Sequence, residues 1–480
     1  MDSNKYEIVV GLEVHVQLQT QSKLFCGDSA GFGAAPNTHI SAISLAHPGI
    51  LPRMNNKAIE YAIKLGLSLG CEIEQHNYFA RKNYFYPDLP KGYQISQHTT
   101  PICKNGFVKI KTEQAERSIR LNRIHIEEDA GKSLHDVDEH NTSIDLNRAG
   151  VPLLEIVSEP DIHSSDEAFA YITELRRLVR WLEVCDGNME EGSMRCDANI
   201  SVRLKGETRL GTRVEVKNLN SIRNVKRAID LEADRLVALI ENGETIIQET
   251  RSYDADKHTT FSLRTKEDAD DYRYFADPDL SPFEISDAYL TDIRNGLPAL
   301  PEALEHQYVE QYGLSIYDAH FICSDKAFAR FFELTIQHQP HYKAVANWIM
   351  GPIKSYLNDH ALELEQLPLL PQQLAQMVQL VEEGKVNFGI ASTRVFQGMI
   401  QAPQASALEV ATALNCLQES DQGSIEKWVL EAIQKMPEKV KEYQSGKKGL
   451  IGLFAGEVKK LSKGKADMQL VNKLLIEKLQ

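Results

Sequence analysis

The chain has 480 residues, with 53 lysines and arginines against 68 aspartates and glutamates, so its formal charge is −15. Hydrophobic residues make up 42% and charged residues 25%, which excludes disorder over most of the length, and the length predicts about two to four domains. No stretch reaches the roughly 18 apolar residues of a membrane span, and no basic segment leads into an apolar one at the start. We therefore expect a cytoplasmic protein without membrane contact.

Residues 6 to 18 alternate between apolar and polar side chains, and Glu13, His15 and Gln17 share the polar parity. This period of two predicts a strand with one buried face and one polar face. Glu13 and His15 should therefore point to the same side of a sheet.

Residues 81 to 97 combine aromatic, basic and proline residues in one segment without periodicity. Pro87-Asp88 and Pro90-Lys91-Gly92 are typical of turns. We expect a rigid loop that presents Lys82, Tyr84, Asp88, Lys91 and Tyr93. A purely structural loop that pins aromatic rings into the core explains the same composition.

A helix and a hairpin follow in the middle of the chain. Ser164 and Glu167 form a capping-box pattern, and apolar residues then recur every three to four positions at Phe169, Ile172, Leu175, Val179 and Leu182. Residues 194–203 and 212–217 both alternate around a turn at 205–207, which predicts an antiparallel hairpin. Its polar faces include Arg195, Asp197, Arg213, Glu215 and Lys217.

From Gly296 onward the strand-type alternation stops and helical periodicity begins, with expected breaks at Pro340, Gly351, Pro371 and Pro403. Residues 424–434 have the spacing of an amphipathic helix. We predict an α+β domain at 1–295, a helical domain at 296–405 and a small helical tail at 406–480. Residues 424–480 contain twelve lysines and seven acids, so this tail is basic while the rest of the chain is acidic.

Polar clusters rich in acids are embedded in apolar strand patterns of the first 280 residues. They are Glu13 with His15, Glu127 with Glu128 and Asp129, Glu155 with Glu159, and the set Glu190, Glu191, Asp197 and Glu215. Carboxylates that converge from different strands could hold Mg²⁺ together with substrate phosphates. Acids on solvated strand faces that pair with nearby arginines produce the same pattern, so the pattern alone leaves both interpretations open.

The familiar nucleotide-binding motifs are missing, and the cysteines form no recognisable site. A phosphate loop ending at Gly131-Lys132-Ser133 would need glycine at position 126, where the chain has Ile126. The run from Gly31 also fails as a dinucleotide fingerprint. The seven cysteines lie far apart without a CxxC pair, so we expect reduced, buried thiols rather than disulfides or a zinc-thiolate site.

Longer motifs extend over almost the whole chain: GLEVHVQL (11–18), SKLF (22–25), RIHIEEDAGKS (123–133), DLNRAGVPLLEIVSEPD (145–161), MEEGSMRCDANISVR (189–203), VKNLNS (216–221), QETR (248–251), DDYRYF (270–275) and NWIMG (347–351). With these motifs the chain resembles the B subunits of the aspartyl/glutamyl-tRNA(Asn/Gln) amidotransferases. The resemblance implies a catalytic sheet similar to those of glutamine synthetase and the guanidino kinases, a helical domain, and a tail similar to YqeY proteins.

The resemblance also implies a function. Together with an amidase (A) subunit and a small (C) subunit, such a protein would use ATP to phosphorylate the side-chain carboxylate of Glu-tRNA(Gln) or Asp-tRNA(Asn). Glutamine-derived ammonia would then displace the phosphate. Two alternatives remain: a non-catalytic tRNA-binding scaffold, and a free-standing ligase of a small amino acid. The sequence does not indicate which charged tRNA is used.

The family motifs assign roles to residues of this chain. Magnesium binding is expected at Glu13, His15, Glu128 and Glu155, although Mg²⁺ prefers oxygen and His15 could act through water. Lys82 and Lys91 resemble residues that line an ammonia passage. Arg195, Asp197 and Lys217 are assigned to nucleotide or substrate contact because of the face on which they lie.

Two further expectations concern zinc and RNA. Many family members hold zinc with four cysteines, but the matching positions here are Cys26, Asp28, Ser41 and Ser44, so we expect no zinc. In the basic tail, lysine side chains suit contact with the phosphates of tRNA, and those expected to do so are Lys447, Lys448, Lys459, Lys460, Lys463 and Lys465.

Overall fold

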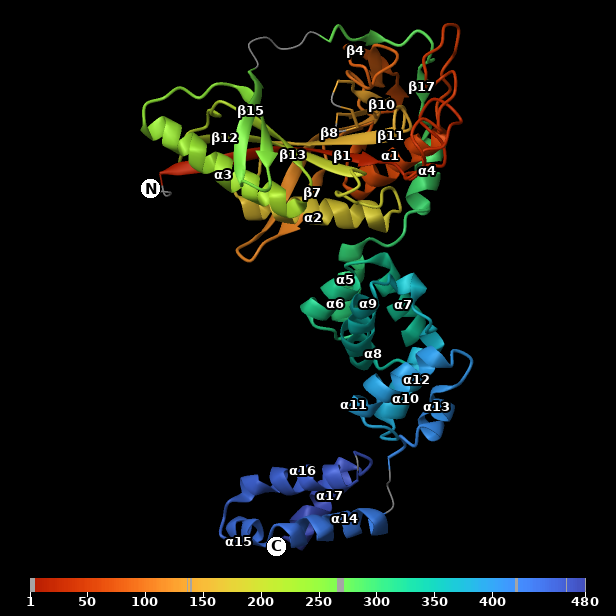
Figure 1. Cartoon of the computed structure of the whole chain (residues 1–480), viewed down its shortest axis with the longest axis vertical. Coiled ribbons are helices and arrows are strands. Elements are labelled where there is room, and N and C mark those ends of the chain that lie inside the picture. The colour runs from red at the N-terminus through yellow and green to blue at the C-terminus, as the bar shows by residue number, and fades with distance from the viewer. Residues whose placement is uncertain are drawn as a thin grey trace. The chain divides into compact units, whose positions relative to one another are not determined.

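The computed structural model describes residues 5–135, 137–138, 140–265, 272–418, 422–462 and 464–479. The chain divides into two compact units, residues 1–300 and 301–480 (Figure 1). The finer division at residues 405 and 406 stays a prediction. No helix in the described ranges is long and apolar enough to cross a membrane.

A large mixed sheet forms the centre of the first unit. Neighbouring strands are antiparallel except β13 and β14, which are parallel. Its ten described strands have the order β15 (Thr259–Thr265), β14 (Glu249–Asp254), β13 (Val214–Leu219), β12 (Met194–Leu204), β1 (Tyr6–Gln17), β11 (Pro152–Ser158), β8 (Glu116–Glu128), β6 (Cys103–Lys104) and β2 (Glu72–Ile73), with β7 (Phe107–Lys111) also paired to β8. The predicted α+β class, with a sheet rich in antiparallel pairs, is confirmed.

Helices cover one face of this sheet. Figure 1 shows α2 (Ser165–Trp181) and α3 (Ile222–Glu241) along that face, and α1 (Asn56–Ser68) belongs to the same apolar core. Leu12, Val14 and Val16 of β1 point into this core and are buried. Because side chains alternate along a strand, the polar residues of β1 must lie on the opposite face. The predicted strand and its two faces are confirmed.

Helix α2 begins where the capping pattern predicts. The Ser164 hydroxyl accepts a hydrogen bond from the backbone N–H of Glu167, and the Glu167 carboxylate accepts one from the N–H of His163 rather than of Ser164. Ile172, Leu175 and the other predicted core positions are buried, but Phe169 is 42% exposed. Phe169 lies in the second turn, at the edge of the apolar stripe.

This difference predicts unequal effects of two substitutions on α2. Ile172→Ala removes a fully buried side chain and should cost about 2–5 kcal/mol, so backbone amides of α2 should exchange with deuterium about 30-fold faster or more. Phe169→Ala should accelerate exchange by a smaller factor, because Phe169 is already 42% exposed and leaves less of a cavity. Equal acceleration in both variants would contradict this packing.

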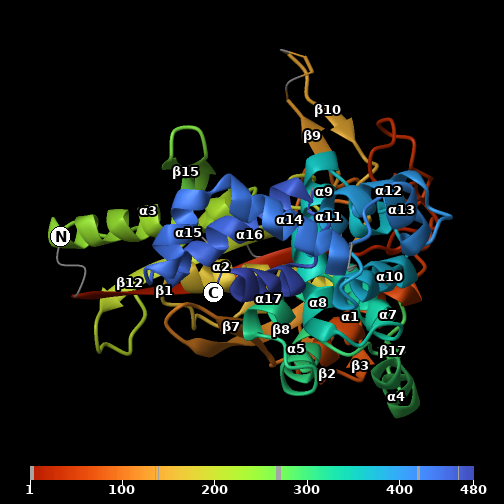
Figure 2. The same cartoon turned by 90° about the horizontal axis from the view of Figure 1, so that it is seen from below.

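Smaller strands and a fourth helix complete the first unit. Strands β4 (Ala80–Asn83) and β5 (Tyr93–Ser96) pair around residues 84–92, so the predicted 81–97 loop is a hairpin, and only residues 84–92 at its tip are a loop. The pair of β9 (Lys132–Leu134) and β10 (Ser143–Asp145) extends beyond the rest of the unit (Figure 2). The other elements are β16 (Phe275–Ala276), which pairs with β4, β3 (His76–Asn77), which pairs with β17 (Phe283–Glu284), and α4 (Asp287–Asn295).

The second unit is helical in its described residues, as predicted from residue 296 onward. The elements of its first part are α5 (Pro301–Glu310), α6 (Ile316–Ile322), α7 (Lys326–Ile336), α8 (Tyr342–Trp348), the π-helix η1 (Ile349–Ile353), α9 (Lys354–His360), the 3-10 helix η2 (Leu364–Gln366), α10 (Pro371–Glu382), α11 (Phe388–Ile390), the π-helix η3 (Ala391–Val395), α12 (Phe396–Gln401) and α13 (Ala407–Ala413). The expected break at Gly351 is wrong, because helix continues from Tyr342 to His360. The wider π turn accommodates Pro352, which has no N–H to donate.

The end of the chain forms its own apolar cluster. Ile425, Val429 and Ala432 are buried in this cluster, as the predicted helix at 424–434 requires. The helices are α14 (Gln422–Lys435), α15 (Pro437–Gln444), the 3-10 helix η4 (Lys448–Leu450), α16 (Ile451–Leu461) and α17 (Met468–Lys478).

Candidate active site

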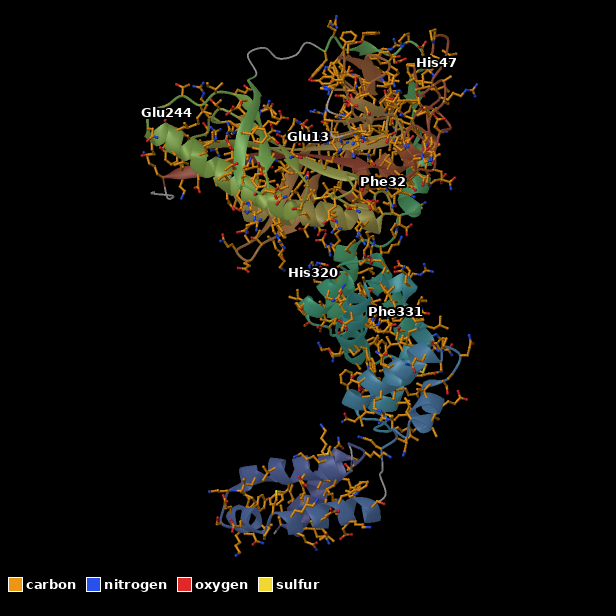
Figure 3. All side chains as sticks on the ribbon, in the orientation of Figure 1. Glu13, Phe32, His47, Glu244, His320 and Phe331 are labelled. Carbon is orange, nitrogen blue, oxygen red and sulfur yellow. The ribbon has the colours of Figure 1, made fainter. Side chains whose placement is uncertain are left out.

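The polar face of the sheet, opposite the helices, aligns ionisable residues from four strands. Strand pairing places His15 of β1 directly opposite Glu155 of β11 and opposite Arg195 of β12. Glu155 in turn lies opposite His125 of β8. Glu13, labelled in Figure 3, lies opposite Asp197 on the next row of the same face. The antiparallel register therefore brings residues far apart in sequence onto one continuous surface.

Glu155 connects two histidines on this surface. Its Oε2 lies 3.5 Å from His15 Nε2 and 3.4 Å from His125 Nε2. His15 Nε2 is also 3.5 Å from Glu13 Oε1 and 3.8 Å from Glu127 Oε1. His125 Nε2 is 3.5 Å from the other oxygen of Glu127. Three carboxylates and two imidazoles thus form one cluster, which we call the Glu–His cluster.

The acids of the Glu–His cluster favour the protonated, positively charged form of its two histidines. Burial alone would lower the pKa of His15 and of His125, but the neighbouring carboxylates outweigh burial and raise each pKa to about 9. Burial likewise opposes ionisation of Glu155, yet the two histidines hold its pKa well below the usual range. Burial and the repulsion of Glu155 raise the pKa of Glu13.

The Glu–His cluster fits a divalent cation. The possible ligand atoms of Glu13, His15 and Glu155 all lie within 4.8 Å of one another. The same holds for those of His125, Glu127 and Glu155, so the two sets share Glu155. The buried Nδ1 of His125 has no hydrogen-bond partner among the described atoms. Mg²⁺ prefers oxygen, so the carboxylates are the suitable direct ligands, with the histidines beside them.

Arg195 is held beside the Glu–His cluster by a buried carboxylate. Asp129 Oδ2 accepts hydrogen bonds from Arg195 at 2.9 Å and from Gln17 Nε2 at 2.7 Å, and Arg148 lies 3.7 Å away. Burial would raise the pKa of Asp129, but the two arginines outweigh it and lower the pKa. Asp129 therefore remains ionised and orients the Arg195 guanidinium.

Lys217 occupies the other end of the polar face. Its ammonium lies 2.5 Å from Asp197 and 3.0 Å from Glu215, and Glu215 also accepts a hydrogen bond from Thr250 at 2.8 Å. Burial lowers the pKa of Lys217, but these acids outweigh it and raise the pKa. The structure thus brings together Arg195, Asp197 and Lys217 on the face from which their contact role was predicted.

Glu128 lies apart from the Glu–His cluster. Its carboxylate is 2.6 Å from Lys91 Nζ and accepts a hydrogen bond from the N–H of Ile95 at 2.8 Å. Glu127, its neighbour on β8, points into the Glu–His cluster instead. The metal role of Glu128 stays a prediction. Glu128 and Lys91 also line a cavity of about 230 Å³, together with Cys26, Ser44 and His47.

Lys82 has a different setting from Lys91. Its Nζ lies 4.9 Å from the ring centre of Tyr272 and 5.9 Å from that of Tyr84. Burial lowers its pKa, but Glu127, Tyr274 and Glu155 together outweigh burial and raise the pKa. Lys82 is therefore a cation within electrostatic reach of the Glu–His cluster. The passage role predicted for both lysines stays a prediction.

The four positions that match the family's zinc ligands do converge. Cys26 Sγ lies 3.6 Å from Ser44 Oγ, and Ser44 donates a hydrogen bond to Asp28. Ser41 also donates to Asp28, which contributes to a lowered pKa against the opposing effect of burial. Hydrogen bonds thus connect these residues. All seven cysteines are free, and six of them are buried, as predicted for thiols.

Sequence reasoning missed His125 and did not select Glu127 and Asp129 as site residues. The signal was present in part, since His125 and Glu127 share one parity in the strand that ends at Glu128. The shared parity of His125 and Glu127 has a meaning only when residues 116–128 are recognised as one strand. In the sequence alone, residues 124–128 are a mixture of apolar and acidic residues.

The lysines of the tail differ in the contacts that their side chains make. Lys447 pairs with Glu442 at 3.0 Å, and Lys448 lies 4.2 Å from the centre of the Tyr443 ring. Lys459 and Lys460 are exposed on α16, and Lys465 is half-buried. The ammonium groups of these three make no hydrogen bond or ion pair with other residues of the described tail. Lys463 lies outside the described residues.

Comparisons with known proteins agree along the whole chain. Residues 8–291 match the family model described as the GatB/GatE catalytic domain, and residues 330–479 match the model described as the GatB domain. A protein of Alkalilimnicola ehrlichii is 48% identical over 477 residues, covering 99% of both chains, and its name identifies it as the B subunit of an aspartyl/glutamyl-tRNA(Asn/Gln) amidotransferase. Proteins of the same name from Geotalea daltonii (48% identical, covering 99% of this chain and 100% of the relative) and Thermodesulfovibrio yellowstonii (45%, covering 99% and 100%) are similar.

Proposed function

This chain belongs to the family of aspartyl/glutamyl-tRNA(Asn/Gln) amidotransferase B subunits, and from this premise we propose that it catalyses the ATP-dependent activation step of amidation. The substrate is an aspartate or glutamate esterified to tRNA. The supporting observation is the Glu–His cluster, flanked on its sheet by Arg195 and Lys217.

The proposed reaction has two steps. One oxygen of the side-chain carboxylate attacks the γ-phosphorus of ATP, a new P–O bond forms, and the bond to the bridging oxygen breaks so that ADP leaves with the electron pair. Ammonia then attacks the carbonyl carbon of this acyl phosphate. The C–O bond breaks, inorganic phosphate leaves, and the nitrogen loses a proton to give the amide.

The residues of the sheet suit the first step. Bound Mg²⁺ would neutralise charge on the transferring phosphoryl group, and Glu13, Glu127 and Glu155 are the groups that would hold it. Arg195, fixed by Asp129, and Lys217, fixed by Asp197, place positive charge where nucleotide phosphates can bind. This arrangement needs no phosphate loop, which explains the missing motif.

The B-subunit name of the relatives implies an assembly with other subunits. We propose that one partner is an amidase (A) subunit, which releases ammonia from glutamine, and that the other is a small (C) subunit, with a cytoplasmic location for the assembly. The specific fold likeness to glutamine synthetase and the guanidino kinases, and to YqeY proteins in the tail, is part of this proposal. We expect ATP and Mg²⁺ as the only cofactors.

The function is tested with the purified three-subunit enzyme. Amide formation is measured on Glu-tRNA(Gln) and on Asp-tRNA(Asn), with and without ATP. The proposal requires that at least one charged tRNA is amidated and that omission of ATP stops the reaction. A product that forms from free glutamate after RNase treatment would instead indicate a ligase of small amino acids.

The tail is proposed to bind tRNA through phosphate contacts. Joint replacement of Lys459 and Lys460 by glutamate should weaken tRNA binding about tenfold or more at low salt, because two exposed cations become anions. The slope of log K against log salt should also fall by about 1–2. An unchanged salt slope in filter binding would exclude these two lysines from the interface.

A further inference from the structure

Lys82 is an unusual cation near the Glu–His cluster. Among the described residues its ammonium makes no hydrogen bond and no ion pair, although the side chain is partly buried. Its neighbours are the aromatic rings of Tyr272 and Tyr84. A ring face attracts a cation but leaves the three N–H donors of an ammonium without acceptors. The hydrogen-bonding capacity of Lys82 is therefore unused.

Lys91 has the counter-charge that Lys82 lacks in the described part of the chain. Both lysines come from the hairpin of β4 and β5, yet Lys91 has a carboxylate partner at 2.6 Å in Glu128. Two acids, Glu127 and Glu155, act on Lys82 electrostatically, but neither lies within 4.0 Å of its ammonium. An anion between Lys82 and these acids, bound with a metal ion, would therefore complete the site.

The tyrosines keep Lys82 in this place. Tyr272 packs edge to face against both Tyr84 and Tyr274, with ring centres 6.1 Å apart in each pair. Tyr274 in turn stacks on His98 at 4.0 Å. This tyrosine cage, formed by Tyr84, Tyr272 and Tyr274, restricts the long lysine side chain, so less conformational entropy is lost when an anion binds.

Sheet order indicates which anion this is. Glu127 and Glu155 lie on β8 and β11, on one side of β1, whereas Asp197 and Lys217 lie on β12 and β13, on the other side. Attacking and leaving oxygens in phosphoryl transfer are roughly in line, so the nucleophile and the nucleotide approach from opposite sides. If the nucleotide contacts Lys217, the nucleophilic carboxylate approaches from the side of Lys82.

We propose that the ammonium of Lys82, held by the tyrosine cage, binds the side-chain carboxylate of the tRNA-bound amino acid and presents it for phosphorylation. This inference rests on the proposed function and identifies the acceptor side of the site. It gives Lys82 a role in the first chemical step, before ammonia takes part, which a residue of an ammonia passage would not have.

The test uses the three-subunit enzyme with Lys82→Met in this chain. Charged-tRNA-dependent ATP hydrolysis and amide formation should both lose about 100- to 1000-fold in kcat/KM for the charged tRNA, as for removal of a positioned donor. The KM for ATP should change less than about threefold. Lys82→Arg, which keeps the charge, should recover part of the loss.

Ammonium chloride in place of glutamine separates the two roles of Lys82. Ammonia from solution does not need a passage, so a passage defect should be rescued by ammonium whereas a carboxylate-binding defect should persist. Full rescue of Lys82→Met by ammonium, with normal ATP hydrolysis, would overturn the proposal. So would a large rise in the KM for ATP, which would place the ammonium on the nucleotide.

Further variants control for folding and for the cage. Lys57→Met is a control, because Lys57 also lies over a tyrosine, 5.0 Å from the ring centre of Tyr61, but on the exposed side of α1, where it pairs with Glu60 at 2.8 Å. It should leave all activities unchanged. Tyr272→Leu should raise the KM for charged tRNA about tenfold, whereas Tyr272→Phe, which keeps the ring face, should stay near the parent value. Equal effects of the two would overturn the role of the cage.

The parent enzyme distinguishes failure of this inference from failure of the proposed function. If the unsubstituted complex shows no charged-tRNA-dependent ATP hydrolysis, the proposed function fails. If the parent is active and Lys82→Met, with intact glutaminase activity of the complex, is equally active, only the role of Lys82 fails.

Discussion

Replacement of Glu155 by glutamine is expected to lower charged-tRNA-dependent ATP hydrolysis about 1000-fold or more. Glu155 is the one carboxylate shared by both ligand sets, and its Oε2 lies within 3.5 Å of both His15 and His125. The amide has the same shape but no charge, so the Glu–His cluster loses the anion that holds a cation and both imidazolium protons. Phosphate release with and without charged tRNA measures the effect.

The glutaminase reaction provides the control for Glu155→Gln. Glutaminase activity of the assembled enzyme should remain near the parent value, because we propose that the amidase subunit, and not this chain, hydrolyses glutamine. Arg120→Gln is a matched surface variant, since Arg120 pairs with Asp161 at 2.7 Å on β8 with 71% of its side chain exposed, and it should leave ATP hydrolysis unchanged. Unchanged hydrolysis in Glu155→Gln would refute the proposed metal site.

Replacement of Glu128 by glutamine is the second large effect that we expect. The Glu128 carboxylate is almost completely buried, pairs with Lys91 and accepts the N–H of Ile95, so it fixes the end of the hairpin tip that leads into β5. Removing one partner of a buried ion pair costs about 3–5 kcal/mol and leaves Lys91 without its counter-charge. Amide formation should fall about 100-fold or more.

The nitrogen source shows how Glu128 acts. If Glu128 holds Lys91 in an ammonia passage, glutamine-dependent amidation should fall much more than ammonium-dependent amidation. If Glu128 is a metal ligand, as the family motif predicts, both should fall together with ATP hydrolysis. Lys91→Met should reproduce the first pattern. Full activity of Glu128→Gln with both glutamine and ammonium would exclude both the passage role and the metal role.

Local pattern was enough to predict much of the fold. Alternation in residues 6–18 placed Glu13 and His15 on one polar face, and the hairpin from Met194 to Leu219 formed as expected. The helix after Ser164 and the helical second unit also agree with prediction. These features depend on the periods of strands and helices, which are properties of neighbouring residues.

Local pattern failed where a few residues changed the geometry. The π turn at Gly351 continues a helix that the sequence predicted to break, because the wider turn accommodates Pro352, which has no N–H to donate. Phe169 fits the helical period but lies at the exposed edge of the stripe. In both cases the α-helical period alone did not decide the outcome.

By itself, the sequence determined the family, the α+β class, the basic tail and the shared face of Glu13 and His15, since ordered motifs and periodicity are local. Only the tertiary structure decided that His125 lies opposite Glu155, that Glu127 rather than Glu128 joins the Glu–His cluster, and that Lys82 has tyrosine rings where Lys91 has a carboxylate. The physical reason is register. Pairing between distant strands decides which side chains meet, and no period within one strand specifies its partner.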